Sequence, residues 1–244
     1  MRKLLLVFTL PMLLLSCGKE YQTLVGKGEL ESETRILEEF TNVKSTIAAN
    51  IQIFESDEYK VIVTLQKNLI PYLETTVKNG VLSISFDGYS VSTNKPISID
   101  IYTPSLNEFT LTGSGDVTSE LPLSNINLTG SGNFNCVGEV DNLNITLSGS
   151  GNFHLFDMPA VNADIALTGS GNIYVTVIEN LKVTITGSGN VYYKGNPSIN
   201  TSILGSGNVI NSNRQRQSNR NYYGNKKGGS ILHHAFPFVF SKIY

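Results

Sequence analysis

The chain has few of the residues that exported proteins use to cross-link a small core or that enzymes use to hold a metal. Its 244 residues include two cysteines and three histidines. Two cysteines form at most one disulfide, so a multiply cross-linked scaffold is excluded. His154 stands alone, and His233 and His234 are adjacent near the end of the chain, so the spacing of a three-ligand zinc site is missing. We expect no metal and no cofactor.

Helical periodicity and nucleotide-binding loops are missing as well. In the second half of the chain, no window repeats apolar residues at helical spacing. A glycine-rich motif is present, but no Lys-Ser or Lys-Thr follows it and no helix is predicted after it, so it is not a phosphate loop. It also lacks the Gly-Gly-x-Gly-x-Asp pattern of calcium-loaded β-rolls. The motif therefore predicts neither nucleotide nor calcium binding.

What the second half does contain is a repeated motif, Gly-Ser-Gly-Asn, usually preceded by Thr or Ser. Successive copies are 17, 19, 20, 18 and 18 residues apart. A period this short and regular indicates one supersecondary unit per copy, stacked on its neighbours so that they share one core. The first glycines of the six copies are Gly113, Gly130, Gly149, Gly169, Gly187 and Gly205.

Within each copy, apolar and polar residues alternate with a period of two. In the third copy, apolar residues occupy every second position of 143–147, and the same phase continues through Gly149 and Gly151 to Phe153. This alternation is typical of a half-buried strand. Both glycines share the inward phase, which predicts a tight corner with no room for an inward Cβ atom.

The outward residues of stacked coils should form rows along the axis, with a spacing of about 4.8 Å between coils. Threonines and serines would form two such rows. Stacked asparagines can hydrogen-bond to one another along a row, whereas stacked carboxylates would repel. We expect the third row to be structural, with a binding surface as the alternative. This row, called the asparagine ladder below, contains Asp116, Asn133, Asn152, Asn172, Asn190 and Asn208.

Residues 1–16 have the features of a signal peptide. A basic start, Met1-Arg2-Lys3, precedes an apolar run of 12 residues, Leu4–Leu15, which is too short to span a bilayer. Leu14-Leu15-Ser16-Cys17 resembles the lipobox of bacterial lipoproteins, which implies lipidation of Cys17; an ordinary signal peptide is the alternative. Gly18 follows the cysteine, so the aspartate associated with inner-membrane retention is absent. The expected location is the outer membrane, facing the periplasm or the cell surface.

The mature chain divides into three expected parts. A lipidated Cys17 with a polar tether covers 17–33, a single all-β repeat domain covers 34–209, and a basic tail covers 210–244. The first half of the domain has strand signals without the full motif, and Ile47-Ala48-Ala49-Asn50 is read as a worn copy. Lys78-Asn79-Gly80 predicts a hairpin turn. Further strands are expected over 60–65, 72–77, 81–86 and 97–102.

Charge separates the tail from the rest of the chain. Lys and Arg minus Asp and Glu gives 10 − 20 = −10 over 17–208 and 6 − 0 = +6 over 209–244. We expect the tail to be disordered; folding back on the acidic body, contact with anionic lipid or polysaccharide, and no role are the alternatives. An exported chain with an acidic body is not expected to bind nucleic acid. Cys136 lies on the inward phase and should act as a small apolar residue.

Several segments, taken together and in order, resemble one known family. They are Asn68-Leu69-Ile70-Pro71-Tyr72-Leu73-Glu74, the strand pair around Lys78-Asn79-Gly80, Lys95-Pro96-Ile97, Thr103-Pro104-Ser105-Leu106, the repeated Gly-Ser-Gly-Asn/Asp and Tyr192-Tyr193-Lys194-Gly195-Asn196-Pro197. Over 36–209 the set resembles the putative auto-transporter adhesin head, or GIN, domain of exported proteins common in Bacteroidetes. The resemblance implies an all-β, parallel β-helix-like solenoid and no established activity. Most copies here end in Asn where the family often has Asp, which weakens any inference of cation binding.

Two classes of function follow from these observations. The first is a non-catalytic envelope lipoprotein that presents a regular β face to glycan or protein partners, with Tyr174, Tyr192 and Tyr193 contributing to the contacts. The second is a carbohydrate-active enzyme on a parallel β-helix, which would need clustered carboxylates on neighbouring coils. The acids of the repeat region are scattered over different phases, and Lys182 and Lys194 are the only bases between 110 and 208. We therefore expect a binding module and no enzyme.

Overall fold

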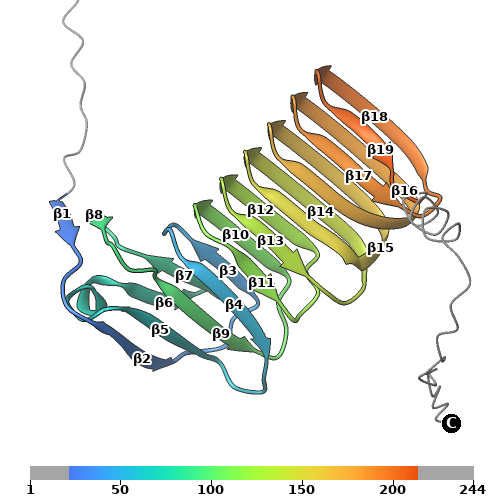
Figure 1. Cartoon of the computed structure of the whole chain (residues 1–244). Helices are drawn as coiled ribbons and strands as arrows, with labels where there is room; N and C mark the ends of the chain where they lie inside the picture. The colour runs from blue at the N-terminus through green and yellow to red at the C-terminus, as the bar shows by residue number, and fades with distance from the viewer. Residues whose placement is uncertain (1–21, 214–244) are drawn as a thin grey trace, which may run out of the picture.

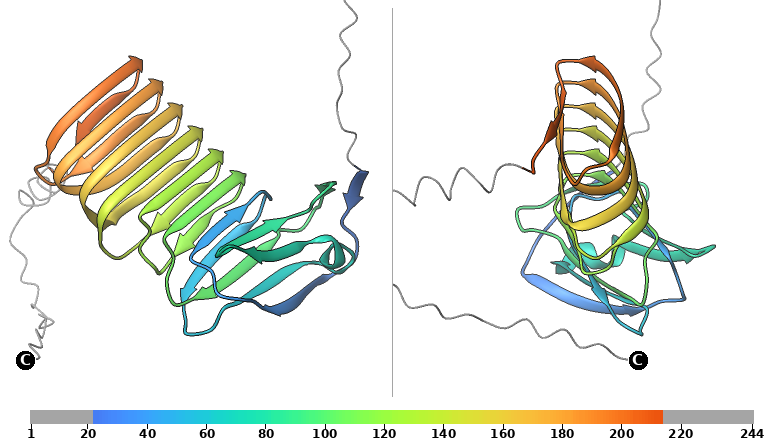
Figure 2. Two further views of the ribbon diagram at one scale, coloured as in Figure 1. Left: turned by 180° about the vertical axis from the view of Figure 1, so that it is seen from behind. Right: turned by 90° about the vertical axis from the view of Figure 1, so that its right-hand side faces the viewer.

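The alternation of apolar and polar residues turns each repeat into a coil of two strands that meet at the Gly-Ser-Gly corner. The computed structural model describes residues 22–213, and their coils stack into an elongated solenoid (Figure 1). The strands before the corners form one wall, called here the pre-corner sheet, and the strands after the corners form the other, the post-corner sheet. Figure 2 shows the same stack from behind and from the side.

The strands of the repeat region follow the predicted order. The pre-corner sheet contains β10 (Glu108–Gly113), β12 (Asn125–Gly130), β14 (Val140–Gly149) and β18 (Ser198–Gly205). The post-corner sheet contains β11 (Val117–Ser119), β13 (Asn133–Cys136), β17 (Asn190–Lys194) and β19 (Asn208–Asn211). Two long strands, β15 (Asn152–Gly169) and β16 (Asn172–Gly187), begin in the post-corner sheet of one coil and end in the pre-corner sheet of the next.

Neighbouring coils pair in parallel, as predicted, and stay in register at the corners, with register shifts between Leu155 and Asn162 where β15 pairs with β16. Gly130 is paired with Gly149, and Gly149 with Gly169. The inward residues of the alternating pattern are buried and form one continuous core. Phe109, Phe134 and Phe153 stack along this core with ring centroids 5.6 Å apart at each step.

The corner explains why two glycines are needed in each copy. Gly149 has a φ of 136°, which side chains rarely allow, and a Cβ atom there would overlap the carbonyl oxygen of Gly130. A Cβ atom at Gly151 would overlap the carbonyl oxygen of Gly132. The backbones of successive corners therefore lie too close together for any side chain, and Ser150 N–H donates to Gly130 O at 3.0 Å.

The worn copy near Ile47 is a true coil. Its strands β3 (Asn42–Ser45) and β4 (Asn50–Glu55) pair in parallel with β10 and β11. One further coil is made by β7 (Val81–Ser85) and β9 (Ser98–Thr103), which pair in parallel with β3 and β4. The parallel stack therefore extends two coils beyond the first Gly-Ser-Gly motif.

Antiparallel strands cover the N-terminal end of the stack. Strand β5 (Lys60–Gln66) pairs with β9 on one side and with β2 (Leu30–Ile36) on the other, and β6 (Glu74–Lys78) forms a hairpin with β7. The predicted turn of that hairpin is confirmed, with positive φ angles at Asn79 and Gly80. The strand expected from residue 72 begins at Glu74, because a 3-10 helix, η1 (Lys67–Tyr72), occupies the preceding residues.

Part of the segment predicted as a tether, 17–33, forms strands instead. Strand β1 (Gln22–Val25) pairs in parallel with β8 (Tyr89–Ser92), and β2 begins at Leu30. The predicted signal peptide, Cys17 and all but the first four residues of the predicted tail lie outside the described residues. Within residues 22–213, no helix is long and apolar enough to cross a membrane.

Candidate functional site

The asparagine ladder forms one continuous row along the corner side of the post-corner sheet. Each asparagine donates its side-chain N–H to Oδ1 of the residue one coil earlier. The donor–acceptor distance is 2.8 Å from Asn133 to Asp116 and 3.0 Å from Asn152 to Asn133. It is 3.2 Å for each of the three remaining donors, Asn172, Asn190 and Asn208. Oδ1 of Asn50 accepts the backbone N–H of Asp116 at 3.3 Å. The row therefore starts at the worn copy and holds seven coils together.

These bonds decide how much of the ladder is available to a ligand. Each carboxamide uses one N–H on its neighbour, and Asp116 is the only carboxylate in the row. Among residues 22–213, no three His, Cys, Asp or Glu side chains gather in a group that could hold a metal ion. The ladder thus offers a ligand the second amide hydrogen of the asparagines from Asn133 to Asn190, spaced by the coil repeat, and Oδ2 of Asp116 at one end.

A second asparagine row lies on the pre-corner sheet and was not predicted. Asn162 donates to Oδ1 of Asn142 at 3.2 Å, and Asn180 donates to Oδ1 of Asn162 at 2.7 Å. The signal was present in the repeat spacing, because these residues are 20 and 18 positions apart, as the neighbouring corner glycines are. Both walls of the solenoid therefore carry amide rows.

An aromatic column lies beside the ladder on the post-corner sheet. His154, Tyr174 and Tyr192 occupy the same register position in three successive coils. The rings of His154 and Tyr174 stack at 5.1 Å with planes 10° apart, and those of Tyr174 and Tyr192 stack at 4.8 Å with planes 9° apart. His154, which the sequence places alone on the outward phase, is thus the first ring of a stack of three.

A groove borders this column at the His154 end. One side of His154 packs on Tyr174, and on the other side the register position is held by the smaller Asn135 and then Thr118. A hollow of about 230 Å³ opens there, and Phe156 and Asp157 also line it. Two aromatic rings, one amide, two hydroxyl groups and one carboxylate therefore line a shallow site.

Two predicted contributors to this surface behave differently. Tyr193 faces inward and is buried, so only Tyr174 and Tyr192 of the three tyrosines contribute to the outward face. Lys194 lies over the ring of Phe156, with Nζ 3.8 Å from the ring centroid. This places a positive charge beside the column, on a body that is acidic overall.

Cys136 lies beneath the groove and is not a nucleophile. Its side chain is 2% exposed, and burial raises the pKa of the thiol to about 12. The thiol Sγ donates to the carbonyl oxygen of Leu121 at 3.0 Å. Because the thiolate is the reactive form, a thiol with this pKa stays protonated and inert at neutral pH.

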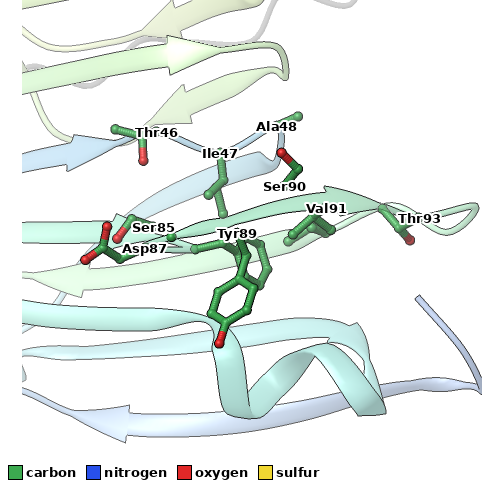
Figure 3. A pocket seen from close by; sticks show the side chains of 12 residues that line it. Thr46, Ile47, Ala48, Ser85, Asp87, Tyr89, Ser90, Val91 and Thr93 are labelled. Carbon is green, nitrogen blue, oxygen red and sulfur yellow. The ribbon is translucent and has the colours of Figure 1, made fainter. Parts of the chain in front are cut away.

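A larger hollow of about 580 Å³ lies at the N-terminal end, where one corner is much longer than the others. In the worn copy, the corner between β3 and β4 has the four residues 46–49. In the coil of β7 and β9, which pairs with it, the corner has the thirteen residues 85–97. Figure 3 shows Asp87, Tyr89 and Val91 of the long corner on one side of the hollow and Thr46–Ala48 on the other. The walls mix apolar side chains with hydroxyl groups.

Hydrogen bonds join the long corner, the residues after β1, β5 and η1 to one another. Gly26 N–H donates to Ser92 O at 2.8 Å, and Thr93 Oγ1 donates to Oε1 of the buried Gln66 at 2.7 Å. The amide of Asn68 accepts from Lys27 N–H and donates to Val25 O. These hydrogen bonds therefore fix the segments around the hollow at the N-terminal end of the described chain.

Comparison with known proteins finds similarity to adhesin-like domains. The sequence pattern of the family described as "Putative auto-transporter adhesin, head GIN domain" matches residues 39–197. A crystal structure of a putative adhesin from Bacteroides fragilis superimposes with a TM-score of 0.59 at 22% identity, covering 77% of this chain and 99% of that one. A putative lipid binding protein from Parabacteroides distasonis gives a TM-score of 0.54 at 25% identity, covering 78% and 99%. None of the curated proteins compared with the chain matches it.

Proposed function

Because the chain belongs to the putative auto-transporter adhesin head GIN domain family, we propose that it is a non-catalytic cell-envelope lipoprotein whose post-corner sheet binds glycan. The observation that carries this proposal is the aromatic column with its groove at His154. The structural neighbour from Bacteroides fragilis is named as a putative adhesin.

The chemistry of the groove matches that of a sugar ring. A pyranose has one face of C–H groups, which packs on an aromatic ring, and a rim of hydroxyls that both donate and accept hydrogen bonds. His154 offers the ring, Asn135 and Thr118 offer groups that donate and accept, and Asp157 accepts. Tyr174 and Tyr192 continue the column over two more coils and, because their rings are stacked, offer ring edges and hydroxyl groups for repeated weak contacts with a polymer.

A glycan array and an envelope pull-down test this surface. His154→Ala should weaken glycan binding about tenfold or more, the usual effect of removing a central aromatic contact. The matched control is Tyr102→Ala, which removes a stacked aromatic ring from the same wall but outside the groove. Equal binding by both variants and the parent would refute the site, and turnover of a bound glycan would refute the non-catalytic part of the proposal.

The lipid anchor is a separate part of the proposal and has its own test. It rests on the lipobox-like Leu14-Leu15-Ser16-Cys17 after a short apolar run. Radiolabelled palmitate should be incorporated into the protein, and Cys17→Ala should abolish that labelling. Fractionation of the envelope should place the labelled protein in the outer membrane. Labelling that persists in Cys17→Ala would show that the anchor lies elsewhere.

A second candidate function is favoured by the hollow beside the long corner. Its volume of about 580 Å³ is within the range of small-molecule sites, and Ile47, Phe86 and Ile97 supply apolar walls. One structural neighbour carries the name of a putative lipid binding protein. A fluorescent fatty acid should bind the parent and lose affinity in Val91→Trp, which fills the hollow; binding unchanged by Val91→Trp would exclude this hollow as the site.

A further inference from the structure

Among residues 22–213, no strand covers the core of the solenoid beyond its last coil. All eight residues of β18 are exposed. Ile199 and Ile203 are in register with Leu181 and Ile185 of the preceding coil, which are 1% and 0% exposed, yet they are themselves 42% and 43% exposed. They have the inward phase of buried residues, and only a further layer would bury them.

Within the part of the chain that the structure describes, this edge lacks the charges that usually protect an edge from pairing. Residues 195–213 contain no charged side chain, and their one proline, Pro197, precedes β18. Natural sheets guard their edges with charges, prolines or bulges. The N-terminal end of the same stack is covered by the antiparallel strands β5 and β6. The unguarded end is therefore suited to a partner.

The residues of β18 whose side chains face the core also direct their backbone N–H and C=O groups to the open end. In this wall, the outward residues Asn125 and Asn144 donate their N–H groups to the preceding coil. Asn200 occupies the same register column. Since successive residues of a strand direct their N–H and C=O groups to opposite sides, Ile199, Thr201 and Ile203 direct theirs to the open end.

We propose that this edge is an interface between two copies of the chain, which meet end to end about a two-fold axis. An antiparallel pairing of the two β18 strands centred on Thr201 puts Ile199 opposite Ile203 of the second copy. All three facing pairs then use the free N–H and C=O groups identified above. Their side chains face inward, so the two cores merge into one.

A second copy fits this end better than a single added strand does. The open end exposes the edges of two sheets, β18 and β19, around one core. A single strand covers one of these edges, whereas a second copy supplies two strands at the same separation. Residues 195–213 carry no charge, so the two edges themselves do not repel each other. Because a two-fold interface uses the same edge on both copies, stacking stops at two copies and no fibre forms.

A symmetric disulfide tests the predicted register. Cα atoms of a hydrogen-bonded antiparallel pair lie about 5.5 Å apart, which suits a disulfide. In protein lacking residues 1–17, oxidised Thr201→Cys should run as a covalent dimer. Thr184→Cys, exposed on the outward face of the preceding coil, is the matched control and should stay monomeric. A monomeric Thr201→Cys would overturn the register.

Sedimentation analysis tests the interface itself. It also tests the alternative that residues 214–244 of the same chain cover this edge. Ile203→Lys should weaken the dimer at least tenfold, whereas Ile178→Lys, at an isoleucine that is 56% exposed away from the edge, should leave it unchanged. Deletion of 214–244 should also leave the dimer unchanged. A monomeric parent, a dimer that survives Ile203→Lys, or a dimer that forms only after the deletion would refute the proposal. None of these measurements depends on glycan binding.

Discussion

Oδ1 of Asn152 accepts two hydrogen bonds from Asn172, one from its backbone N–H and one from its side-chain amide, each at 3.2 Å. The same double contact joins Asn208 to Asn190 and Asn133 to Asp116. Every side-chain donor points to the preceding coil, so the ladder has a direction. An aspartate, which only accepts when ionised, fits without loss only where no donor to the preceding coil is needed.

This direction predicts opposite effects for two exchanges of similar shape. Asn152→Asp removes the donor to Asn133 Oδ1 and brings a carboxylate against that oxygen, so it should lower the free energy of unfolding by about 1–2 kcal/mol. Asp116→Asn keeps the acceptor for Asn133 and should be neutral or slightly stabilising. Urea denaturation measures both, and equal effects would contradict a directional ladder.

The corner predicts a strong dependence on the second glycine. Gly151→Ala would push a methyl group into the carbonyl oxygen of Gly132 and the side chain of Leu128. Relief requires the two coils to separate, so we expect a loss of about 3 kcal/mol or more in unfolding free energy. Ser150→Ala, at the exposed residue beside it, should change stability by less than about 0.5 kcal/mol. A Gly151→Ala variant as stable as Ser150→Ala would show that the corner can relax.

Cys136 should resist modification in the folded protein. Burial raises the pKa of its thiol to about 12, and the side chain is buried under the groove. In protein lacking residues 1–17, a thiol reagent should give no reaction until guanidinium chloride unfolds the chain. Thr184→Cys provides an exposed thiol on the same molecule and should react at once. Rapid reaction of the parent would mean that the groove opens to the core.

Asp100 should make stability depend on pH in a defined direction. Burial raises the pKa of its carboxyl group above the ordinary value of 3.8. The folded chain therefore holds this proton to a higher pH than the unfolded chain does, and ionisation favours unfolding. Asp100→Asn should raise the melting temperature at neutral pH, and the gain should vanish when the pH falls below about 3. The exposed Asp141→Asn serves as control; a gain that does not depend on pH would point to packing instead of charge.

The repeat region could be predicted from the sequence because two constraints coincide there. A period of about 18 residues fixes which residues lie above one another, and the alternation through Gly149 and Gly151 fixes which of them face inward. Together they determine the ladder from Asp116 to Asn208. The same spacing of 20 residues places His154 against Tyr174, so the repeat also encodes the aromatic column.

The N-terminal end could not be predicted in the same way. The motif is lost there, and the antiparallel pairing of β5 with β9 depends on contacts between residues about 40 positions apart, which no repeat encodes. The polar sequence of 22–33 suggested a tether, yet β1 and β2 are strands because their partners β8 and β5 supply the hydrogen bonds. The hollow at the long corner follows from those same pairings.

The number of near-identical coils in the stack determines the distance between the two ends of the described chain. The described chain enters at β1 and ends at β19, on opposite ends of the molecule (Figure 1). Each coil repeats the corner contacts of the one before it, so duplicating or removing one coil in the middle leaves both ends intact. Every such change moves the ends about 4.8 Å further apart or closer together. Related chains with more or fewer coils would thus differ in the distance between the N-terminal end and the edge at β18 and β19.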